Sequence, residues 1–425
     1  MIMKQVKSYI GPNILSLQER AKVVNNLLQI RLETLLPAVM RETGFDTWVI
    51  ICHEDNHDPV FRTLIPWECW APILQIIVLH DQGPEKGVER LNISRTNMQG
   101  LMTSVWDPKS SEHQWACLRR SLEERQPRRI GINQSDVIWA ADGLTAALKE
   151  KLIATLGPDL ASRLESAEPL CIRWLETRIP EELDLYHHAA AIAHAIIKES
   201  FSRRVITPGV TTCEDLRWYY WQRTRDLGLD VSFPPFFNRQ RSQESRSRWG
   251  ENDLVIRPGD LVHCDVGIEY LRLLTDHQEM AYVLRPGETE SPQGLREGMA
   301  QANRLQEIFT GTWQQGLTGN EILGKALTRA REAGLSKPKI YSHSLGHYLH
   351  EPGPLMGLPW EQENCPGRGD VVMHYNTCYT VELSVTCPIS EWGGQEVSIM
   401  LEQDAAFTAN GVIFLDGRQT EFHFI

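Results

Sequence analysis

Four acidic residues interrupt apolar, strand-like segments in the second half of the chain. They are Asp265, Asp276, Glu382 and Glu402, and the two aspartates are eleven positions apart. A carboxylate within an apolar strand is costly unless it is paired, hydrogen-bonded or bound to a metal ion. Each one alone can be a strand-end residue that caps a turn. Together with a histidine they are consistent with a dinuclear metal site, although spacing alone does not assemble them.

Three histidines stand close together upstream of the two glutamates. His343, His347 and His350 lie within eight residues, in a chain with 14 histidines. Imidazole is a common metal ligand and an acid or base near neutral pH, whereas an isolated histidine is usually structural. The zinc motif HExxH is excluded, because Pro352 and Pro354 prevent the helix that it requires. Oxygen-rich ligands with one imidazole suit Mn²⁺, Co²⁺, Fe²⁺ or Zn²⁺.

The elements predicted around these residues occur in the same order twice. Each set has two helices followed by two strand-like segments. In the first set the helices are Pro180–Ile197 and a second one that opens with a capping box at Thr211–Glu214 and ends near Gly228. The strand-like segments of this set are Asp260–Ile268 and Leu273–Val283. The second comprises Ser291–Gln315, Thr318–Gly334, Thr380–Thr386 and Glu396–Leu401. The repetition is structural rather than a repeat of sequence, and it indicates one internally doubled unit.

The first part of the chain mixes strands and helices, which predicts an α/β domain. A capping box at Ser16–Glu19 opens a helix that runs to about Gly44 and is kinked or split by Pro37. The remaining predicted elements are the strands Trp48–Ile51, Ile73–Leu79 and Arg129–Ile132 and the helix Trp139–Ala154.

Composition excludes several classes of protein. The 425 residues include 43 Lys and Arg against 55 Asp and Glu, a formal charge of −12 that gives no overall attraction to nucleic acid or anionic lipid. No apolar run approaches the length of a membrane helix, and Met1–Asn13 lacks the apolar region of a signal peptide. Nine cysteines, an odd number without a CxxC pair, fit reduced thiols. We therefore expect a cytoplasmic protein without nucleic-acid or membrane partners.

From about Leu175 to the C-terminus the chain resembles the pita-bread metallohydrolases, which include methionine aminopeptidase, Xaa-Pro aminopeptidase, prolidase and creatinase. The resemblance rests on GDLVHCDVG followed by TD, on a histidine and a His-Glu-Pro turn seven residues later, and on the last two glutamates. It implies an α/β (α+β) fold class. Residues 1–174 would be a creatinase/prolidase-like α/β domain, and residues 175–425 a pita-bread catalytic domain with an internal pseudo-two-fold repeat.

The resemblance also implies the roles of the site residues. Asp265 would bind one metal ion, His343 and Glu382 the other, and Asp276 and Glu402 would bridge both. A hydroxide between the two ions would attack the scissile carbonyl. Glu382 would pass the proton to the leaving amine, and His350 would bind the substrate or the oxyanion. The implied cofactors are two divalent ions per subunit, with manganese preferred and cobalt, zinc or iron as alternatives.

The expected activity is hydrolysis of a peptide or amide bond, as in an Xaa-Pro aminopeptidase or dipeptidase, by a homodimer acting on short peptides or small amides. The alternatives are a creatinase-like hydrolase or lyase of a small non-peptide substrate and, third, a non-catalytic binding protein. Three departures leave the substrate open. The segment 245–249 lacks a histidine that the Xaa-Pro enzymes carry, Lys339 replaces another, and Ser344 replaces a glycine.

Three further features are predicted with an alternative for each. The segment 239–248 carries four arginines, and Arg248 is the candidate among them for binding a substrate carboxylate. The alternative is that the segment is a solvated, charged loop. His263 lies two residues before Asp265, which puts it on the same strand face and predicts that it lines the site. The alternative is that His263 belongs to the core. The aromatic patch Trp67/Trp70 is predicted to be domain core, the alternative being a pocket wall.

Overall fold

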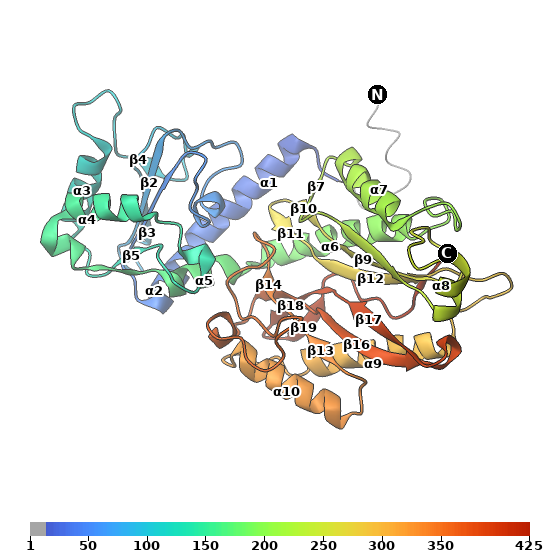
Figure 1. The fold of residues 1–425 in the computed structure, drawn as a ribbon. Coiled ribbons are helices and arrows are strands. Elements are labelled where there is room, and N and C mark those ends of the chain that lie inside the picture. The colour runs from blue at the N-terminus through green and yellow to red at the C-terminus, as the bar shows by residue number, and fades with distance from the viewer. Residues whose placement is uncertain (1–13) are drawn as a thin grey trace. The chain divides into compact units, whose positions relative to one another are not determined.

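The computed structural model describes residues 14–425. Met1–Asn13, for which we predicted that no signal peptide is present, lies outside the described residues. The chain forms two compact units, Leu15–Ile179 and Pro180–Ile425 (Figure 1). Within the described residues, no helix is both long enough and apolar enough to cross a bilayer.

The Leu15–Ile179 unit alternates helices with short strands. Its helices are α1 (Leu17–Ile30), α2 (Leu36–Thr43), α3 (Gln114–Arg125), α4 (Ala146–Ala161) and α5 (Glu168–Glu176). Its strands are β1 (Thr47–His53), β2 (Leu74–Asp81), β3 (Val88–Asn92), β4 (Thr103–Ser104), β5 (Ile130–Ile132) and β6 (Leu164–Ser166).

Its strands form one mixed sheet in the order β4-β3-β2-β1-β5-β6. Strand β1 pairs antiparallel with β2 and parallel with β5, so it lies inside the sheet. Both faces of β1 are covered, which explains its continuous apolar sequence. On one face, Leu118 and Leu122 of α3 and Leu148 and Leu152 of α4 pack against the strands.

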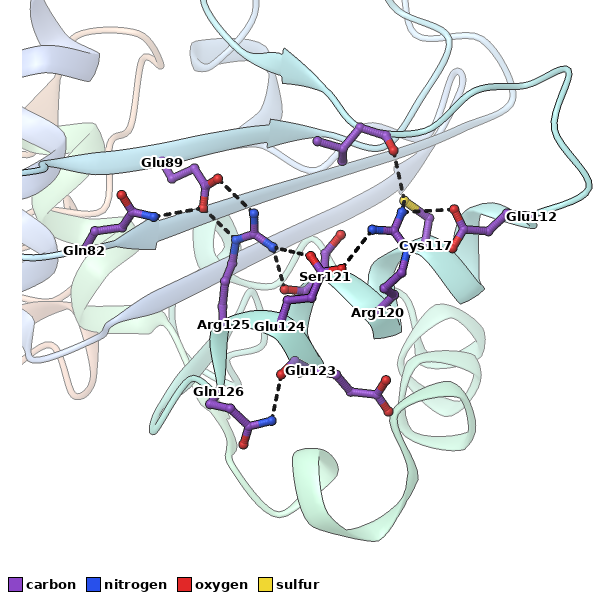
Figure 2. A network of polar contacts seen from close by, with 11 residues as sticks. Gln82, Glu89, Glu112, Cys117, Arg120, Ser121, Glu123, Glu124, Arg125 and Gln126 are labelled. Atoms are coloured by element: carbon purple, nitrogen blue, oxygen red, sulfur yellow. Dashed lines mark hydrogen bonds and ion pairs between the residues drawn. The ribbon is translucent and has the colours of Figure 1, made fainter.

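Ion pairs join α3 to the sheet on the surface of this unit (Figure 2). The Arg125 guanidinium in α3 donates to both carboxylate oxygens of Glu89 in β3, at 2.6 and 2.8 Å. Arg120 makes the same two-point contact with Glu112, which precedes the helix, at 2.9 and 3.0 Å. Paired contacts of this geometry fix the orientation of α3 as well as its position.

The predicted capping box at Ser16 and Glu19 begins α1 as expected. Pro37 does not break the long helix. A π-helical turn, Arg31–Leu35, precedes α2 and accommodates the proline, which has no N–H and would clash with an α-helical carbonyl four residues earlier.

The Pro180–Ile425 unit contains the doubled pattern. Its helices are α6 (Pro180–Ser200), α7 (Cys213–Asp226), α8 (Gln243–Trp249), α9 (Gln293–Thr310) and α10 (Gly319–Glu332). The strands of its first half, together with the last strand of the chain, are β7 (Asp230–Val231), β8 (Phe236–Gln240), β9 (Leu261–Val266), β10 (Ile268–Tyr270), β11 (Leu273–Leu274), β12 (His277–Tyr282) and β20 (His423–Phe424). Those of its second half are β13 (Lys339–Ile340), β14 (Ser344–Leu345), β15 (Thr377–Thr380), β16 (Leu383–Ile389), β17 (Gln395–Leu401), β18 (Asp404–Thr408) and β19 (Gly411–Phe414).

The two halves of this unit meet along β12 and β17. The sheet β20-β12-β9-β8 belongs mainly to the first half, and the sheets β13-β16-β17 and β14-β15-β18-β19 belong to the second. Helices α6 and α7 lie on one side of these strands and α9 and α10 on the other (Figure 1). The backbones of Gln278 and Glu402 exchange two hydrogen bonds, at 3.1 and 3.0 Å, where the halves meet.

Three predicted boundaries differ in the structure. The units divide at Ile179–Pro180 rather than after residue 174, because α5 is held in the first unit, where the Trp174 indole donates to Thr63. The capping box of α7 begins at Thr212 and uses Asp215, one residue later than predicted. The helix predicted from Trp139 is interrupted, and α4 begins only after the N-cap Thr145.

Candidate metal centre

The two aspartates are placed by the hairpin of β9 and β12. Asp265 lies in β9 directly opposite Gln278 of β12, and Asp276 immediately precedes β12. Opposed residues of antiparallel strands share a face, so the Asp265 and Gln278 side chains project to the same side. Gly267 permits the tight hairpin, since a Cβ there would lie 1.9 Å from the Thr275 carbonyl oxygen.

The other three candidates lie at breaks between strands of the second half. His343 precedes β14, Glu382 separates β15 from β16, and Glu402 separates β17 from β18. The backbone of His343 is anchored by Thr380, whose N–H donates to the His343 carbonyl at 2.9 Å. At a break, a polar side chain can turn inward while the flanking apolar residues stay in the core.

The structure brings three of the five candidates into direct proximity. One ligand atom from each of Asp276, His343 and Glu402 lies within 4.8 Å of the other two, and all three residues are buried. The His343 Nε2 and Asp276 Oδ2 atoms are 3.7 Å apart. Asp265 and Glu382 are partly buried and border this group, since their charges affect the pKa values of its members.

Burial and mutual repulsion dominate the electrostatics of the four carboxyl groups. Burial raises the pKa of Asp265 to about 6. Burial, followed by repulsion from neighbouring carboxylates, raises the pKa values of Asp276, Glu382 and Glu402 well above their usual range. Within residues 14–425, no lysine or arginine forms an ion pair with any of them. The site therefore gathers four carboxyl groups whose ionised forms repel one another and have no paired cation among the described residues.

The histidine presents a free lone pair to this charge. The His343 Nδ1 lies 3.2 Å from the Ser344 carbonyl oxygen, which can only accept, so Nδ1 carries the proton. Burial, and then the nearby His350, lower the pKa of His343 well below its usual value, so the ring is neutral. A neutral imidazole whose Nδ1 donates to a carbonyl is the arrangement in which Nε2 ligates a metal.

The donor set fits divalent cations. Asp276 Oδ1 and Glu402 Oε1 are buried and have no hydrogen-bond partner among residues 14–425, which is costly unless another group satisfies them. Carboxylate oxygens and one imidazole nitrogen suit first-row divalent metals. Asp265, Asp276, His343, Glu382 and Glu402 are therefore the residues that would hold such ions.

Two further groups, His350 and Arg368, carry charge that acts on the ligand candidate His343. The exposed His350 ring packs edge-on against His343, with the ring centroids 4.3 Å apart. Desolvation, and then the positive charge of Arg368, lower the pKa of His350. Within the described chain, Arg368 pairs with no carboxylate. Its guanidinium makes one hydrogen bond there, to the Glu351 carbonyl at 3.0 Å, and the Nε is buried without a partner. Sequence analysis missed Arg368, which is far from any motif.

His263 and the residue it contacts form a second layer behind the ligands. The His263 Nε2 lies 3.0 Å from the Gln278 Oε1, and burial lowers the pKa of His263 to about 4. Gln278 in turn contacts Glu382 and Glu402. His263 thus reaches the ligands only through Gln278. Sequence analysis missed Gln278, although its position two residues after Asp276 puts both on one strand face.

The arginine-rich segment lies apart from this site. The Arg248 guanidinium stacks over Trp249, 4.8 Å from the ring centroid, and contacts none of the five ligand candidates. Arg239, Arg241 and Arg246 line a separate cavity of about 430 Å³. In that cavity Arg241 is already paired with two carboxylates. A role of Arg248 in substrate binding thus stays a prediction without a supporting contact.

The prediction that the aromatic patch is core is wrong for Trp70. Its side chain is 66% exposed, and Trp67 is only partly buried. The two residues lie in the loop between Phe61–Thr63 and β2, where the Cys69 N–H donates to the Pro66 carbonyl in a turn, so Trp70 belongs to an exposed loop and not to the sheet.

The comparison with protein families decides the affiliation. The model of metallopeptidase family M24 matches residues 184–409, which is more than half of the chain. The chain belongs to metallopeptidase family M24. This match covers all five ligand candidates and His350, and M24 metallopeptidases use divalent metals. The predicted affiliation and fold class, an α/β chain with a pita-bread unit, are confirmed.

Solved structures share the architecture of this M24 protein at low identity. The X-Pro aminopeptidase from Thermotoga maritima MSB8 is 17% identical over 91% of this chain and 100% of that chain, with a TM-score of 0.65. The Xaa-Pro dipeptidase from Bacillus anthracis is 16% identical over 95% of this chain and 100% of that chain, with a TM-score of 0.60. The N-terminal domain of the FACT complex subunit SPT16 from Cicer arietinum is 12% identical over 92% of this chain and 96% of that chain, with a TM-score of 0.55. A search of curated proteins gave no significant match.

Proposed function

We propose that this M24 protein hydrolyses short Xaa-Pro peptides with two divalent ions, manganese in the first instance, held by the five ligand candidates. The observation that supports the proposal is the cluster of Asp276, Glu402 and a neutral His343, on which the charges of Asp265 and Glu382 act. No lysine or arginine of the described residues pairs with these carboxylates. When bound, the ions would supply an activated water and polarise the scissile carbonyl.

The residues of the chain would perform the remaining steps. Gln278 occupies one lone pair of Glu382 Oε1, which leaves Oε2 to take up a proton and pass it to the leaving amine. His350 is exposed beside the ligands, where it would donate a hydrogen bond to the oxygen that becomes negative. Asp276 and Glu402, the more enclosed of the four carboxylates of this site, would hold both ions.

Arg368 supports a substrate with a free carboxylate. The positive charge of its guanidinium acts on His350 and His343, and the guanidinium has no acidic partner in the described chain, so a substrate carboxylate would complete its contacts. This argument favours a dipeptidase, in which the carboxylate of an Xaa-Pro dipeptide pairs with Arg368, over an aminopeptidase that takes long peptides.

Metal content and peptide hydrolysis together test the proposal. We expect the purified protein to bind two ions per chain and to cleave Xaa-Pro dipeptides in the presence of Mn²⁺, Co²⁺ or Zn²⁺. Glu402→Gln is expected to lose bound metal and at least about a hundred-fold in kcat/KM, since a metal ion contributes several kcal/mol to the transition state. Full activity of the wild type after exhaustive chelation would falsify the metal mechanism.

A matched pair of substrates tests the role of Arg368. Arg368→Gln should raise KM for an Xaa-Pro dipeptide about ten- to hundred-fold, which corresponds to the binding free energy lost with a hydrogen bond to a charged group. The same substitution should leave KM for the corresponding dipeptide amide unchanged, because the amide has no carboxylate to pair. An equal change for both substrates contradicts the proposed contact.

Two other functions have a specific observation each. A creatinase-like hydrolase or lyase is favoured by the missing histidine in segment 245–249, and cleavage of small amides without cleavage of any peptide would support it.

A binding protein is a candidate because the fold also occurs in a FACT complex subunit, and absence of bound metal would support it. Homodimerisation, which sedimentation tests, and a cytoplasmic location remain predictions.

A further inference from the structure

Gln278 lies where the two halves of the Pro180–Ile425 unit join. It belongs to β12 of the first half, and its backbone N–H and carbonyl both bond to the backbone of Glu402 in the second half. Its side chain is 4% exposed. A neutral amide in such a place must satisfy one acceptor and two donor hydrogens within the protein.

The two donor hydrogens of this amide go to two different metal-ligand candidates. Gln278 Nε2 donates to Glu382 Oε1 at 2.6 Å and to Glu402 Oε2 at 2.9 Å. The two glutamates belong to the second half of the unit, 104 and 124 residues further along the chain. One nitrogen atom therefore sets the distance between two carboxylates that would otherwise repel each other.

The orientation of the amide is set by His263. The Gln278 Oε1 lies 3.0 Å from the His263 Nε2. An amide oxygen can only accept, so His263 Nε2 carries the proton, and a flipped amide would place an NH₂ group against this N–H. Among the described residues His263 Nδ1 has no hydrogen-bond partner, so the contact with Gln278 is the one hydrogen bond that orients the His263 ring.

We propose that Gln278, oriented by His263, is a positioning residue that holds Glu382 and Glu402 at the spacing required for binding two metal ions. Each carboxylate oxygen has a second lone pair, so the contact with Gln278 leaves room for a metal bond. Hydrogen bonds of this kind to ligating groups orient them and raise metal affinity. The inference rests on the proposed metal-dependent function and deepens it.

Isothermal titration of the metal-free protein with Mn²⁺ tests the inference. Gln278→Met keeps the length of the side chain and removes both donors, and it should weaken Mn²⁺ binding about 10- to 100-fold. His263→Phe should weaken binding in the same direction and less. When His263→Phe is added to Gln278→Met, the double variant should bind Mn²⁺ less than about two-fold more weakly than Gln278→Met alone, because His263 acts through Gln278.

Gln419→Met is the matched control. Gln419 is a buried glutamine that bonds the backbone of Met280 on the same strand β12, at 2.8 and 2.7 Å, and contacts no ligand. We expect it to lower Tm and leave Mn²⁺ affinity within two-fold of the wild type. Equal loss of affinity in Gln419→Met, or unchanged affinity in Gln278→Met, overturns the inference.

The same titration separates the inference from the proposed function. If the wild type binds Mn²⁺ but cleaves no peptide, the proposed function fails while the comparison of Gln278→Met with the wild type still decides the inference. If the wild type binds no ion, both fail. Should Gln278→Met not fold, His263→Phe carries the test, and unchanged Mn²⁺ affinity in that variant counts against the inference.

Discussion

His350 differs from the five ligand candidates in being open to solvent. Its ring packs against His343, and no described residue forms a hydrogen bond with it. Because it is not one of the five ligand candidates, its contribution is expected in the reaction rather than in metal binding. This separates it from His263, which is buried and whose ring forms its one hydrogen bond among the described residues with Gln278.

We expect His350→Ala to lower kcat about 10²- to 10³-fold, which is the usual effect of removing one donor to a developing negative charge. The number of bound ions, measured by mass spectrometry of the metals, should not change. A variant that loses metal along with activity would show that His350 is a ligand instead.

The hairpin of β9 and β12 is the element on which the aspartates depend. Gly267 lies between them, and a methyl group there would meet the Thr275 carbonyl oxygen at 1.9 Å and Ser232 Oγ at 2.9 Å. These atoms are backbone or held by a hydrogen bond between Ser232 and Thr275, so they cannot easily move. Any substitution at Gly267 must therefore shift Thr275 and the adjoining Asp276.

Gly267→Ala is expected to lower the free energy of unfolding by about 1–3 kcal/mol, the range for overpacking, and to weaken metal binding. Gly324→Ala in α10 is the control. No atom lies within 4 Å of its Cβ position, so alanine should stabilise the helix by up to about 1 kcal/mol. Chemical denaturation and metal titration of both variants check this, and normal metal affinity in Gly267→Ala would contradict it.

At the scale of the whole molecule, the buried carboxylates link folding to pH and metal. Their raised pKa values mean that the folded, metal-free protein retains protons that the unfolded chain has released. The free energy of unfolding contributed by these groups is therefore greatest below about pH 4 and falls as pH rises through the raised values. Divalent ions displace the protons, so their stabilising effect increases with pH.

We expect Mn²⁺ to raise the Tm of the metal-free protein more at about pH 7.5 than at about pH 5.5, because the pKa of Asp265 is about 6 and those of the other three acids are also raised. An ion at 100 times its Kd adds about 2.7 kcal/mol. Scanning fluorimetry at both pH values measures the shift. Equal shifts at the two pH values, or a larger one at the lower pH, would refute the coupling.

Local patterns in the sequence determined the fold class and the elements around the site. The capping boxes at Ser16 and Thr318 begin helices as predicted, because a cap uses atoms only three residues apart. The same locality explains the small errors. Two adjacent threonines offered alternative caps for α7, and a run of helical residues after Trp139 did not reveal that its first turn is 3-10 rather than α.

The four acidic ligand candidates stood out by type because carboxylates in apolar strands are costly, and this cost is visible in the sequence alone. His343 stood out as one of three clustered histidines, and the resemblance to the pita-bread metallohydrolases joined the five into one set. Only the tertiary structure decided which side chains support them. The contacts of Gln278 with Glu382 and Glu402 and the effect of the Arg368 charge on His350 depend on how distant strands and loops pack. No spacing along the chain encodes such contacts, because packing of the two halves brings the partners together.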